Sequence, residues 1–370
     1  MTYLAIHIGC NPMKNPPSVT SEQALNLPQK NTTNRRIVLN SRPVGVPTAA
    51  NFKLEEGTVP MPSDGQVLLR TLYLSLDPYM RGRMSDAESY APSVALDSVM
   101  VGATVSIVET SLNADYQLGD LVLSANGWQD YALSDGKVLV KLTNDLQKLS
   151  LNLGVLGMPG FTAYMGLIDI GQPKPSETVV VAAASGAVGA VVGQIAKMKG
   201  CKVIGIAGGV DKCHYVVNDL GFDSCIDHHA DDFAQQLAKA CNKGIDIYFE
   251  SVGGKVFDAV LPLLNTKARV PVCGMIASYN NTSLPHGPDR LGLLESILLR
   301  KRIRMQGFII FDDYGSRYPE FAKQMTDWLK QDKVKFLEDI TDGLENAAEV
   351  FIGMLKGKNF GKTIVRVSHY

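Results

Sequence analysis

The chain has 370 residues and a formal charge of −1, with 45% hydrophobic and 20% charged residues. This length favours two domains, because single hydrophobic cores stop growing near about 250–300 residues. The near-neutral charge argues against nucleic acid or anionic lipid as a partner, and no apolar run approaches the roughly 18 residues of a membrane helix.

The six cysteines are scattered, and no two of them form a Cys-x-x-Cys unit. They are Cys10, Cys201, Cys213, Cys225, Cys241 and Cys273. This spacing disfavours a structural zinc site and a disulfide framework. Because reduced thiols are typical of the cytoplasm, we expect a cytoplasmic protein.

Residues 1–33 differ in composition from the rest of the chain. They mix prolines with serine, asparagine and glutamine, and their apolar stretch at residues 3–6 is too short for a signal-peptide core. We expect a flexible N-terminal extension, or the product of an early start codon, with the folded domain beginning near Asn34.

Residues 36–141 have a β-rich pattern. A strand is predicted over Val67–Leu74, a bent strand over Val99–Val108, and a further strand after the turn at 116–120. Short strands separated by turns predict a partly closed β-barrel.

The pattern changes after Pro159-Gly160. Apolar runs at 179–183, 201–207, 245–250 and 269–274 alternate with helical stretches. Such runs predict a parallel sheet covered by helices on both faces, so a doubly wound α/β domain follows the barrel. The last strand candidate, Lys362–Val367, is expected to return to the barrel.

A candidate dinucleotide site lies between the first α/β strand and its helix, at Ala184-Ser185-Gly186-Ala187-Val188-Gly189. Small residues let the backbone approach a pyrophosphate, and the helix N-terminus faces its charge. Alone, the motif could be an ordinary turn. The βαβ unit that follows favours the dinucleotide interpretation.

The end of the next strand predicts which cofactor is bound. An NAD site usually has an acidic residue here, but this chain has Ala207-Gly208-Gly209 followed by Lys212. A small turn and a cation suit the 2′-phosphate of NADPH. Asp211 is interpreted as a first-turn acid of the helix. The alternative for Lys212 is a solvated position on the helix surface.

Zinc ligands are scarce in the predicted barrel. Residues 36–141 contain no cysteine and no histidine, the ligand types of zinc alcohol dehydrogenases. We therefore expect no metal. The pair His228-His229 is interpreted as part of a solvated loop.

Three longer motifs resemble the zinc-independent medium-chain dehydrogenase/reductases. Leu76-Asp77-Pro78-Tyr79-Met80-Arg81, Gly157–Tyr164 and Gly357-Lys358-Asn359-Phe360-Gly361-Lys362 are typical of the leukotriene B4 dehydrogenase / prostaglandin reductase family. Asn34-Arg35-Arg36 and Arg81-Gly82-Arg83-Met84 resemble most the bacterial curcumin reductases within it.

The resemblance implies an α/β fold with two domains. These are a GroES-like, partly closed β-barrel catalytic domain over 34–156 and 337–370, and a doubly wound Rossmann domain over 157–336. It also implies an NADPH-dependent enone reductase that forms a homodimer.

The resemblance further implies which residues bind the cofactor. Gly186, Ala187, Val188 and Gly189 line the pyrophosphate; Gly208, Lys212 and His228 lie at the adenosine phosphate; Ser251, Cys273, Gly274, Ile276, Ser278, Tyr279, Phe308, Ile309, Ile310 and Asn359 lie toward the nicotinamide. His228 and Ser251 depart from the family's tyrosine and asparagine. Both keep hydrogen-bonding capacity, and a protonated His228 would make NADPH affinity dependent on pH.

Three tyrosines are the candidate catalytic residues, because without a metal the carbonyl must be polarised by hydrogen bonds. The resemblance implies that Tyr79, Tyr90 and Tyr279 face the substrate, and a neutral phenol can donate to an enolate oxygen. The alternative is that they are packing residues. Arg81 and Arg83 could attract an acidic substrate tail, but structural salt bridges are the preferred interpretation.

Two other functions stay open at this point. A quinone reductase shares the fold and the metal-free site. A non-catalytic NADPH-binding protein would keep the cofactor residues without turning over an acceptor.

Overall fold

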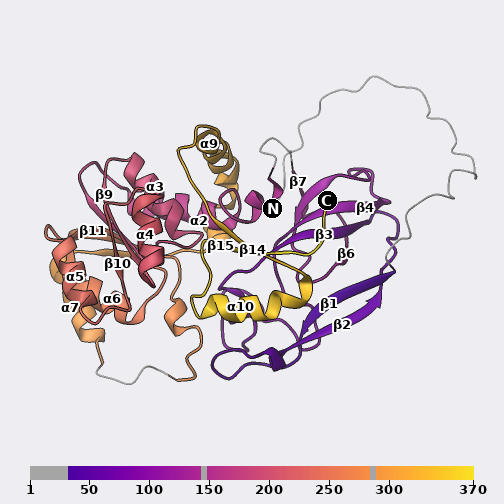
Figure 1. Cartoon of the computed structure of the whole chain (residues 1–370), viewed down its shortest axis with the longest axis horizontal. Helices are drawn as coiled ribbons and strands as arrows, with labels where there is room; N and C mark the ends of the chain where they lie inside the picture. Colours follow the sequence, from indigo (N-terminus) through magenta and orange to yellow (C-terminus); the bar gives the residue numbers. More distant parts are fainter. Residues whose placement is uncertain (1–31, 143–147, 284–288) are drawn as a thin grey trace, which may run out of the picture.

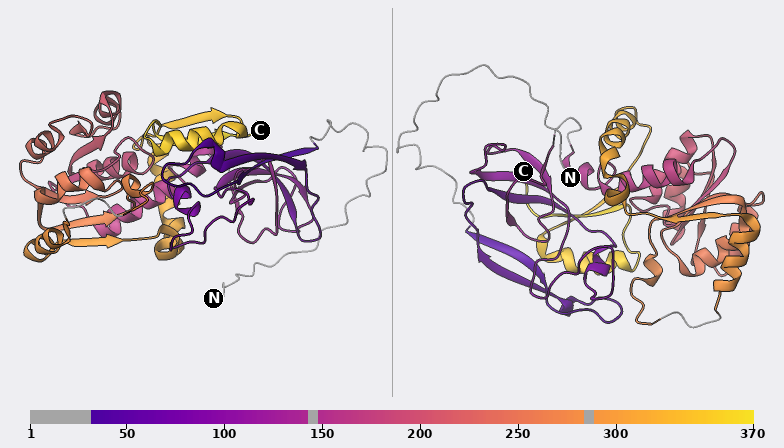
Figure 2. Two further views of the ribbon diagram at one scale, coloured as in Figure 1. Left: turned by 90° about the horizontal axis from the view of Figure 1, so that it is seen from below. Right: turned by 180° about the vertical axis from the view of Figure 1, so that it is seen from behind.

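The structure of the chain is a computed structural model that describes residues 32–142, 148–283 and 289–370. All but the last two residues of the predicted N-terminal extension lie outside these ranges. Thr33 already begins the first strand, β1 (Thr33–Leu39), one residue before the predicted start. Figures 1 and 2 show two sheet-based halves lying side by side.

The first half is built on a seven-stranded sheet and a separate hairpin. The sheet has the order β14 (Glu338–Asp342), β15 (Lys362–Arg366), β3 (Val67–Ser75), β4 (Thr104–Ser111), β5 (Leu121–Ser124), β7 (Val140–Lys141), with β6 (Tyr131–Ser134) on β3. The hairpin pairs β1 with β2 (Phe52–Thr58). Since β6 and β15 follow each other along one edge of β3, the sheet divides there and forms the predicted partly closed barrel.

One predicted strand of this half is partly wrong. Strand β4 begins at Thr104, and residues 99–103 do not continue it. Val99 and Met100 instead pair with the first strand, through a bridge from Val99 to Val38 and a hydrogen bond from the Met100 amide to the Ile37 carbonyl at 3.0 Å. The start of the run 99–108 therefore pairs with β1, whereas the rest of it, from Thr104, pairs with β3.

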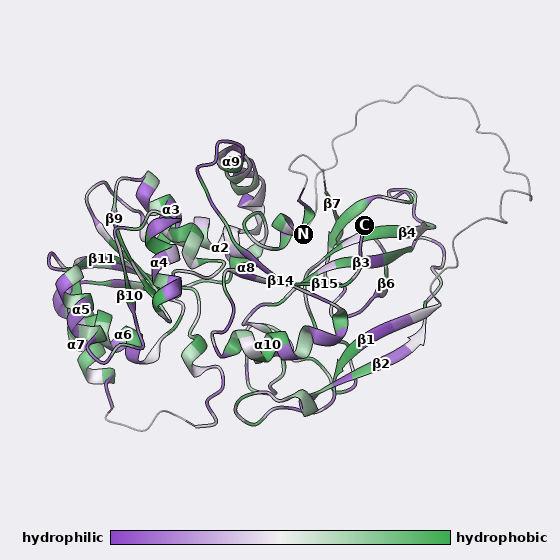
Figure 3. Cartoon of the chain, viewed as in Figure 1, coloured by the Kyte–Doolittle hydropathy of each residue, from purple (hydrophilic) through white to green (hydrophobic). Residues whose placement is uncertain are grey.

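The second half is the predicted doubly wound domain. Its six parallel strands have the order β10 (Ser224–Asp227), β9 (Lys202–Ala207), β8 (Thr178–Val181), β11 (Ile245–Phe249), β12 (Leu264–Val272) and β13 (Arg304–Gly307). Alternate residues of β8 enter opposite cores: Val179 and Val181 pack on one face, Val180 on the other. Both faces are thus buried, and the central strands are apolar in Figure 3.

Helices cover both faces of this sheet. They are α2 (Met158–Met165), α3 (Gly189–Met198), α4 (Val210–Asn218), α5 (Phe233–Ala240), α6 (Gly254–Val260), α7 (Leu291–Lys301), α8 (Ile310–Tyr314) and α9 (Tyr318–Lys330). Two other helices, α1 (Met80–Arg83) and α10 (Ala347–Leu355), pack in the core of the first half. Residues of α2, α3 and α9 share one core, and residues of α5, α6 and α7 share the other. None of the helices within the described ranges is long and apolar enough to cross a membrane.

The chain returns to the first half at its C-terminus, as predicted. Strand β15 pairs in parallel with β14 and antiparallel with β3, and α10 packs against Trp128 and Phe52 through Phe351. The division into domains at 156/157 and 336/337 stays a prediction.

Candidate functional site

The predicted cofactor residues follow the carboxyl ends of the six parallel strands, with Asn359 in the segment before β15 as the exception. Residues 186–189 follow β8, Gly208 and Lys212 follow β9, His228 follows β10, Ser251 follows β11, residues 273–279 follow β12, and residues 308–310 follow β13. In open parallel sheets, ligands bind at this edge, where the strand order reverses. Here the order reverses between β8 and β11.

The turn between β8 and α3 has the close backbone approach of a pyrophosphate site. Ala183 has a φ of +50°, and its carbonyl accepts a hydrogen bond from the Gly186 amide at 2.9 Å. A Cβ at Gly189 would lie 2.4 Å from the same carbonyl oxygen, so this position requires glycine. The tight turn directs the N-terminus of α3 toward the ligand edge.

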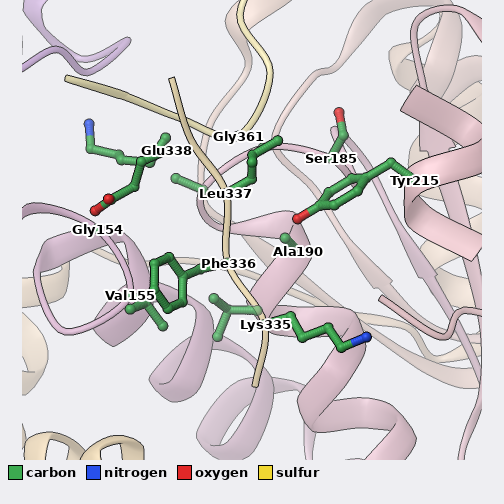
Figure 4. Close-up of a pocket in the computed structure, with 14 residues that line it drawn as sticks. Gly154, Val155, Ser185, Ala190, Tyr215, Lys335, Phe336, Leu337, Glu338 and Gly361 are labelled. Carbon is green, nitrogen blue, oxygen red and sulfur yellow. The ribbon is translucent and has the colours of Figure 1, made fainter. Parts of the chain in front are cut away.

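The first half of the molecule closes onto this turn. Gly186 forms a parallel bridge with Gly361, in the segment before β15. A small pocket adjoins the bridge, between the turn, Tyr215 of α4 and residues 335–338 (Figure 4). Only Asn359 of the motif 357–362 was assigned from the sequence, so the role of Gly361 was missed. Two glycines in one short motif were the available signal.

Lys212 lies in the first turn of α4, beside the end of β9. Its Nζ donates to the Gly357 carbonyl at 2.6 Å, and burial lowers the pKa of its ammonium group. The side chain is therefore held between the two halves. Asp211 lies in the first turn of the same helix, as predicted. Lys212 is half-buried at the helix surface, and its role at the 2′-phosphate stays a prediction.

His228 is more enclosed than the predicted solvated loop. Its backbone amide donates to the Ala207 carbonyl at 3.0 Å, and its Nδ1 is buried without a hydrogen-bond partner. Burial lowers the pKa of the ring, and the neighbouring His229 and Lys255 lower it further. Lys255 Nζ donates to the His228 carbonyl at 2.7 Å. Lys255, which the sequence analysis missed, adds a cation at this end of the site.

Ser251 and Cys273 lie together at the ends of β11 and β12. The Ser251 Oγ is buried and has no hydrogen bond of standard geometry, although Cys273 is its close neighbour. Burial raises the pKa of the Cys273 thiol to about 12, so the thiol stays protonated. The buried Glu250 carboxylate holds this turn by accepting from the amides of Val252 at 2.6 Å and Gly253 at 2.9 Å. The sequence analysis did not assign Glu250.

Phe308, Ile309, Ile310 and Asn359 complete the predicted nicotinamide end. Phe308 and Ile310 are each 8% exposed, and the Ile309 amide donates to Asp313 Oδ2 at 2.7 Å. The Asn359 Nδ2 donates to the Gly361 carbonyl at 3.1 Å.

These residues fit a dinucleotide. Two orphaned buried polar atoms, His228 Nδ1 and Ser251 Oγ, belong to the predicted cofactor set. Buried polar groups without partners are rare and call for a ligand or water. The tight glycine turn between β8 and α3 is a third feature that fits a bound dinucleotide.

The three candidate tyrosines are neighbours across the two halves. Burial raises the pKa of Tyr79, Tyr90 and Tyr279, and electrostatic repulsion from Tyr90 raises it further for the other two. Tyr90 is 59% exposed. All three phenols are therefore protonated at neutral pH and can donate a hydrogen bond.

Tyr279 is anchored to its own loop. Its hydroxyl accepts from the Met275 amide at 3.4 Å, and a Cβ at Gly274 would lie 2.8 Å from the same oxygen. The loop itself is tied to the end of β11, since the Ile276 amide donates to the Ser251 carbonyl at 3.2 Å. Gly274 thus leaves room for the hydroxyl beside the strand end.

The predicted salt bridges of Arg81 and Arg83 are wrong. Within residues 32–142, 148–283 and 289–370, neither guanidinium forms an ion pair. Arg81 instead donates to Asn280 Oδ1 and to the Gly45 carbonyl, both at 2.9 Å. The nearby acid Asp77 is already paired with Lys362, at 3.0 Å.

The barrel residues 36–141 offer no cysteine or histidine. In the described part of the chain, no group of three or more histidine, cysteine, aspartate or glutamate residues could hold a metal ion.

Comparison with known proteins places these features in one family. A model described as the N-terminal domain of oxidoreductase matches residues 35–142, and one described as zinc-binding dehydrogenase matches residues 187–331. The chain is 65% identical over 340 residues to the NADPH-dependent curcumin reductase of Escherichia coli, covering 92% of this chain and 99% of that protein. It is 39% identical over 328 residues to bovine prostaglandin reductase 1, covering 87% and 96%. The structure of CurA from Vibrio vulnificus in complex with NADPH superimposes with a TM-score of 0.89, at 63% identity, covering 91% of this chain and all of that one.

Proposed function

Because the chain belongs to the medium-chain dehydrogenase/reductase superfamily, in the branch of the prostaglandin and curcumin reductases, we propose that it is an NADPH-dependent enone reductase. It reduces the carbon–carbon double bond of α,β-unsaturated carbonyl compounds, such as curcumin-type dienones. When bound, NADPH supplies the hydride that adds to the β-carbon of the substrate. The absence of cysteine and histidine from residues 36–141 supports a reaction without zinc.

The observation that carries this proposal is the cluster of three protonated tyrosines beside the ends of β11 and β12. Reduction of an enone at its β-carbon leaves negative charge on the carbonyl oxygen. A phenol whose pKa is raised stays a hydrogen-bond donor at neutral pH, so Tyr79, Tyr90 and Tyr279 suit stabilisation of that charge. The proton at the α-carbon is supplied by solvent, which reaches the exposed Tyr90.

We assign the remaining residues to binding. The turn at 186–189 holds the pyrophosphate, Lys212 and His228 meet the 2′-phosphate, and the loop at 273–279 lies beside the nicotinamide. Lys212 supports NADPH over NADH because its ammonium group is held beside the turn after β9. Where NAD sites usually have an acidic residue, this turn has Gly208 and Gly209.

The test is NADPH oxidation, followed by its absorbance, with curcumin, a simple enone and a quinone, and with NADH in parallel. We expect fast NADPH oxidation with both enones, a saturated ketone as product, and a much weaker reaction with NADH. The variant Lys212→Met should remove most of the preference for NADPH. Turnover of the quinone alone would favour the alternative of a quinone reductase, and tight NADPH binding without any turnover would favour a binding protein.

We also propose that two copies pair through strand β13 and helix α7. Strand β13 is one of the two edge strands of the six-stranded sheet, and all four of its residues are exposed. Leu291, Leu293 and Leu299 of α7 are each more than half exposed. An exposed edge strand beside apolar side chains favours pairing with another strand, and two-fold pairing would make a homodimer. Analytical ultracentrifugation tests this, and a monomer at micromolar concentration would contradict it.

We further propose a cytoplasmic location, on the grounds that the cysteines are scattered in sequence. The five cysteines within the described ranges are free thiols, as reducing compartments favour.

A further inference from the structure

Helix α4 and strand β10 each place a cysteine at the boundary between them. Cys213 lies in α4, and Cys225 lies in β10, on which this helix packs (Figure 1). Both are free thiols, Cys213 buried and Cys225 half-buried. The cofactor and substrate residues assigned so far do not include them, so the pair is available for a chemistry of its own.

The sheet geometry puts both sulfurs on one face of β9. Cys225 is the register partner of Gly205, and a Cβ at Gly205 would lie 3.1 Å from the Cys225 Sγ and 2.9 Å from Cγ1 of Val216 in α4. Residues three positions apart share a helix face, so the buried Cys213 points toward the sheet as Val216 does. There the Cys213 thiol contacts the Ala207 amide and the Cys225 thiol, its two hydrogen-bonding partners.

The two thiols differ in how readily they lose a proton. The Cys225 thiol donates to the Cys213 sulfur, and this hydrogen bond is the main cause that lowers the pKa of Cys213 and raises the pKa of Cys225. A thiolate is the form of cysteine that reacts with oxidants, and a neighbouring thiol then supplies the second sulfur of a disulfide. Cys213 therefore suits the role of the attacking sulfur, with Cys225 as the resolving one.

The same pair is connected to the residues proposed to meet the 2′-phosphate. Cys213 directly follows Lys212 in α4. Asp227, two residues after Cys225, holds the turn after β9, because its Oδ1 accepts from the Gly209 amide at 2.9 Å. A movement of α4 against β10 would therefore displace both Lys212 and this turn.

We propose that Cys213 and Cys225 form a reversible disulfide in the presence of hydrogen peroxide, and that this disulfide weakens the binding of NADPH. The Cys213 sulfur attacks one peroxide oxygen, the O–O bond breaks, and a sulfenic acid and water are formed. The Cys225 sulfur then forms the S–S bond and displaces the hydroxyl group as a second water. The two thiols lose two electrons and two protons, which the peroxide takes up.

Formation of the bond requires a movement of the helix. Two thiols in hydrogen-bonding contact are farther apart than two bonded sulfurs, so the start of α4 has to move toward β10. Lys212 and the turn at Gly208-Gly209 then lose their alignment with the 2′-phosphate. We expect an affinity for NADPH about tenfold lower or less, as when a hydrogen bond between charged groups is weakened. The inference rests on the proposed place of the 2′-phosphate beside Lys212.

Peptide mapping tests the disulfide. Trypsin cleaves after Lys212 and Lys239, so both cysteines lie in one peptide, 213–239. The whole chain is treated with hydrogen peroxide, and the remaining thiols are blocked with iodoacetamide. We expect this peptide to carry no blocking group and to be lighter by two hydrogens than the unblocked reduced peptide. Dithiothreitol should restore two thiols that can be blocked. A peptide that stays blocked at both cysteines, or that gains oxygen atoms irreversibly, would overturn the proposal.

The fluorescence of bound NADPH measures the effect on binding. The oxidised protein should bind NADPH about tenfold or more weakly than the reduced protein, and dithiothreitol should restore the affinity. Because linkage is reciprocal, saturating NADPH should lower the equilibrium constant for disulfide formation in a glutathione buffer by the same factor. A disulfide that forms but leaves the NADPH dissociation constant unchanged would refute the inference.

The variants Cys213→Ser and Cys225→Ser each remove one partner. In their reduced form they should bind NADPH like the wild type, and peroxide should no longer weaken this binding. Cys213→Ala and Cys225→Ala repeat the measurement without a buried hydroxyl. Cys241→Ser is the matched control: it removes a buried thiol from the core on the opposite face of the sheet and should keep the response to peroxide.

Two outcomes separate this inference from the proposed function. A response to peroxide that persists in both Cys213→Ser and Cys213→Ala would overturn the inference and leave NADPH-dependent reduction intact. A reduced wild-type protein that does not bind NADPH would instead contradict the proposed function, whether or not the disulfide forms.

Discussion

Replacing Lys362 by methionine tests how the barrel holds the Asp77-Pro78-Tyr79 segment. Lys362 is 4% exposed and uses all three of its donors: on Asp77 Oδ1 at 3.0 Å, on the Leu76 carbonyl at 2.7 Å and on the Thr363 carbonyl at 3.1 Å. Asp77 is 5% exposed and keeps one other side-chain partner, the Ser75 hydroxyl. The change therefore leaves a buried carboxylate with one side-chain hydrogen bond and removes one donor from each of two carbonyls, of which that of Thr363 still accepts from the Leu76 amide at 3.2 Å.

The expected loss follows from these contacts. Two hydrogen bonds to carbonyls account for about 1–3 kcal/mol, and an uncompensated buried carboxylate brings the total to about 3–5 kcal/mol of the free energy of unfolding. The double variant Asp77→Asn with Lys362→Met removes the isolated charge. It should lose less than the single variant, about 1–3 kcal/mol.

Urea unfolding followed by tryptophan fluorescence measures this loss. The chain has two tryptophans, and Trp128 is fully buried in the barrel core, so a Trp328→Phe background reports on the barrel alone. Lys137→Met, which breaks a solvent-exposed pair with Asp135, is the matched control and should leave the midpoint unchanged within error. The reasoning is refuted if the single variant is as stable as the control, or if the double variant is less stable than the single one.

Three further outcomes are expected. Tyr279→Phe should lower kcat by roughly tenfold to a thousandfold with little change in the NADPH dissociation constant, since it removes a donor to the developing enolate but keeps the aromatic ring beside the nicotinamide. Wild-type turnover would count against this role. NADPH should bind more tightly as the pH falls from about 8 to about 5.5. Burial lowers the pKa of His228, so its ring is neutral in the free protein, whereas a bound 2′-phosphate favours the protonated ring. An NADPH dissociation constant that does not change with pH would exclude a contact between His228 and the 2′-phosphate. Gly189→Ala should weaken NADPH binding at least about tenfold, because the added Cβ would lie 2.4 Å from the Ala183 carbonyl oxygen. The control Gly315→Ala has open space around its added Cβ and should bind NADPH normally. The fluorescence of bound NADPH measures both variants.

The parallel sheet and its ligand edge could be predicted because they depend on local patterns. Apolar runs such as Val179–Ala183 have strand length, and small residues follow them at the turn into α3. The partners of Arg81 could not be predicted. Asn280 is 199 positions from Arg81 along the chain, and no local pattern indicates that this arginine will bond an amide rather than an acid. The strand β14 was missed because its sequence, Glu338-Asp339-Ile340-Thr341-Asp342, lacks the apolar run that marks a strand.

The position of β15 has a consequence for how the protein is made. This strand lies inside the seven-stranded sheet, between β14 and β3, although it follows all six strands of the parallel sheet along the chain. On the ribosome, the six parallel strands, which end at Gly307, are complete well before this sheet can close. The edge of β3 that pairs with β15 must therefore wait until residues 362–366 have been synthesised. A stop codon that removes β15 would leave a finished nucleotide-binding half attached to a barrel in which nothing joins β14 to β3.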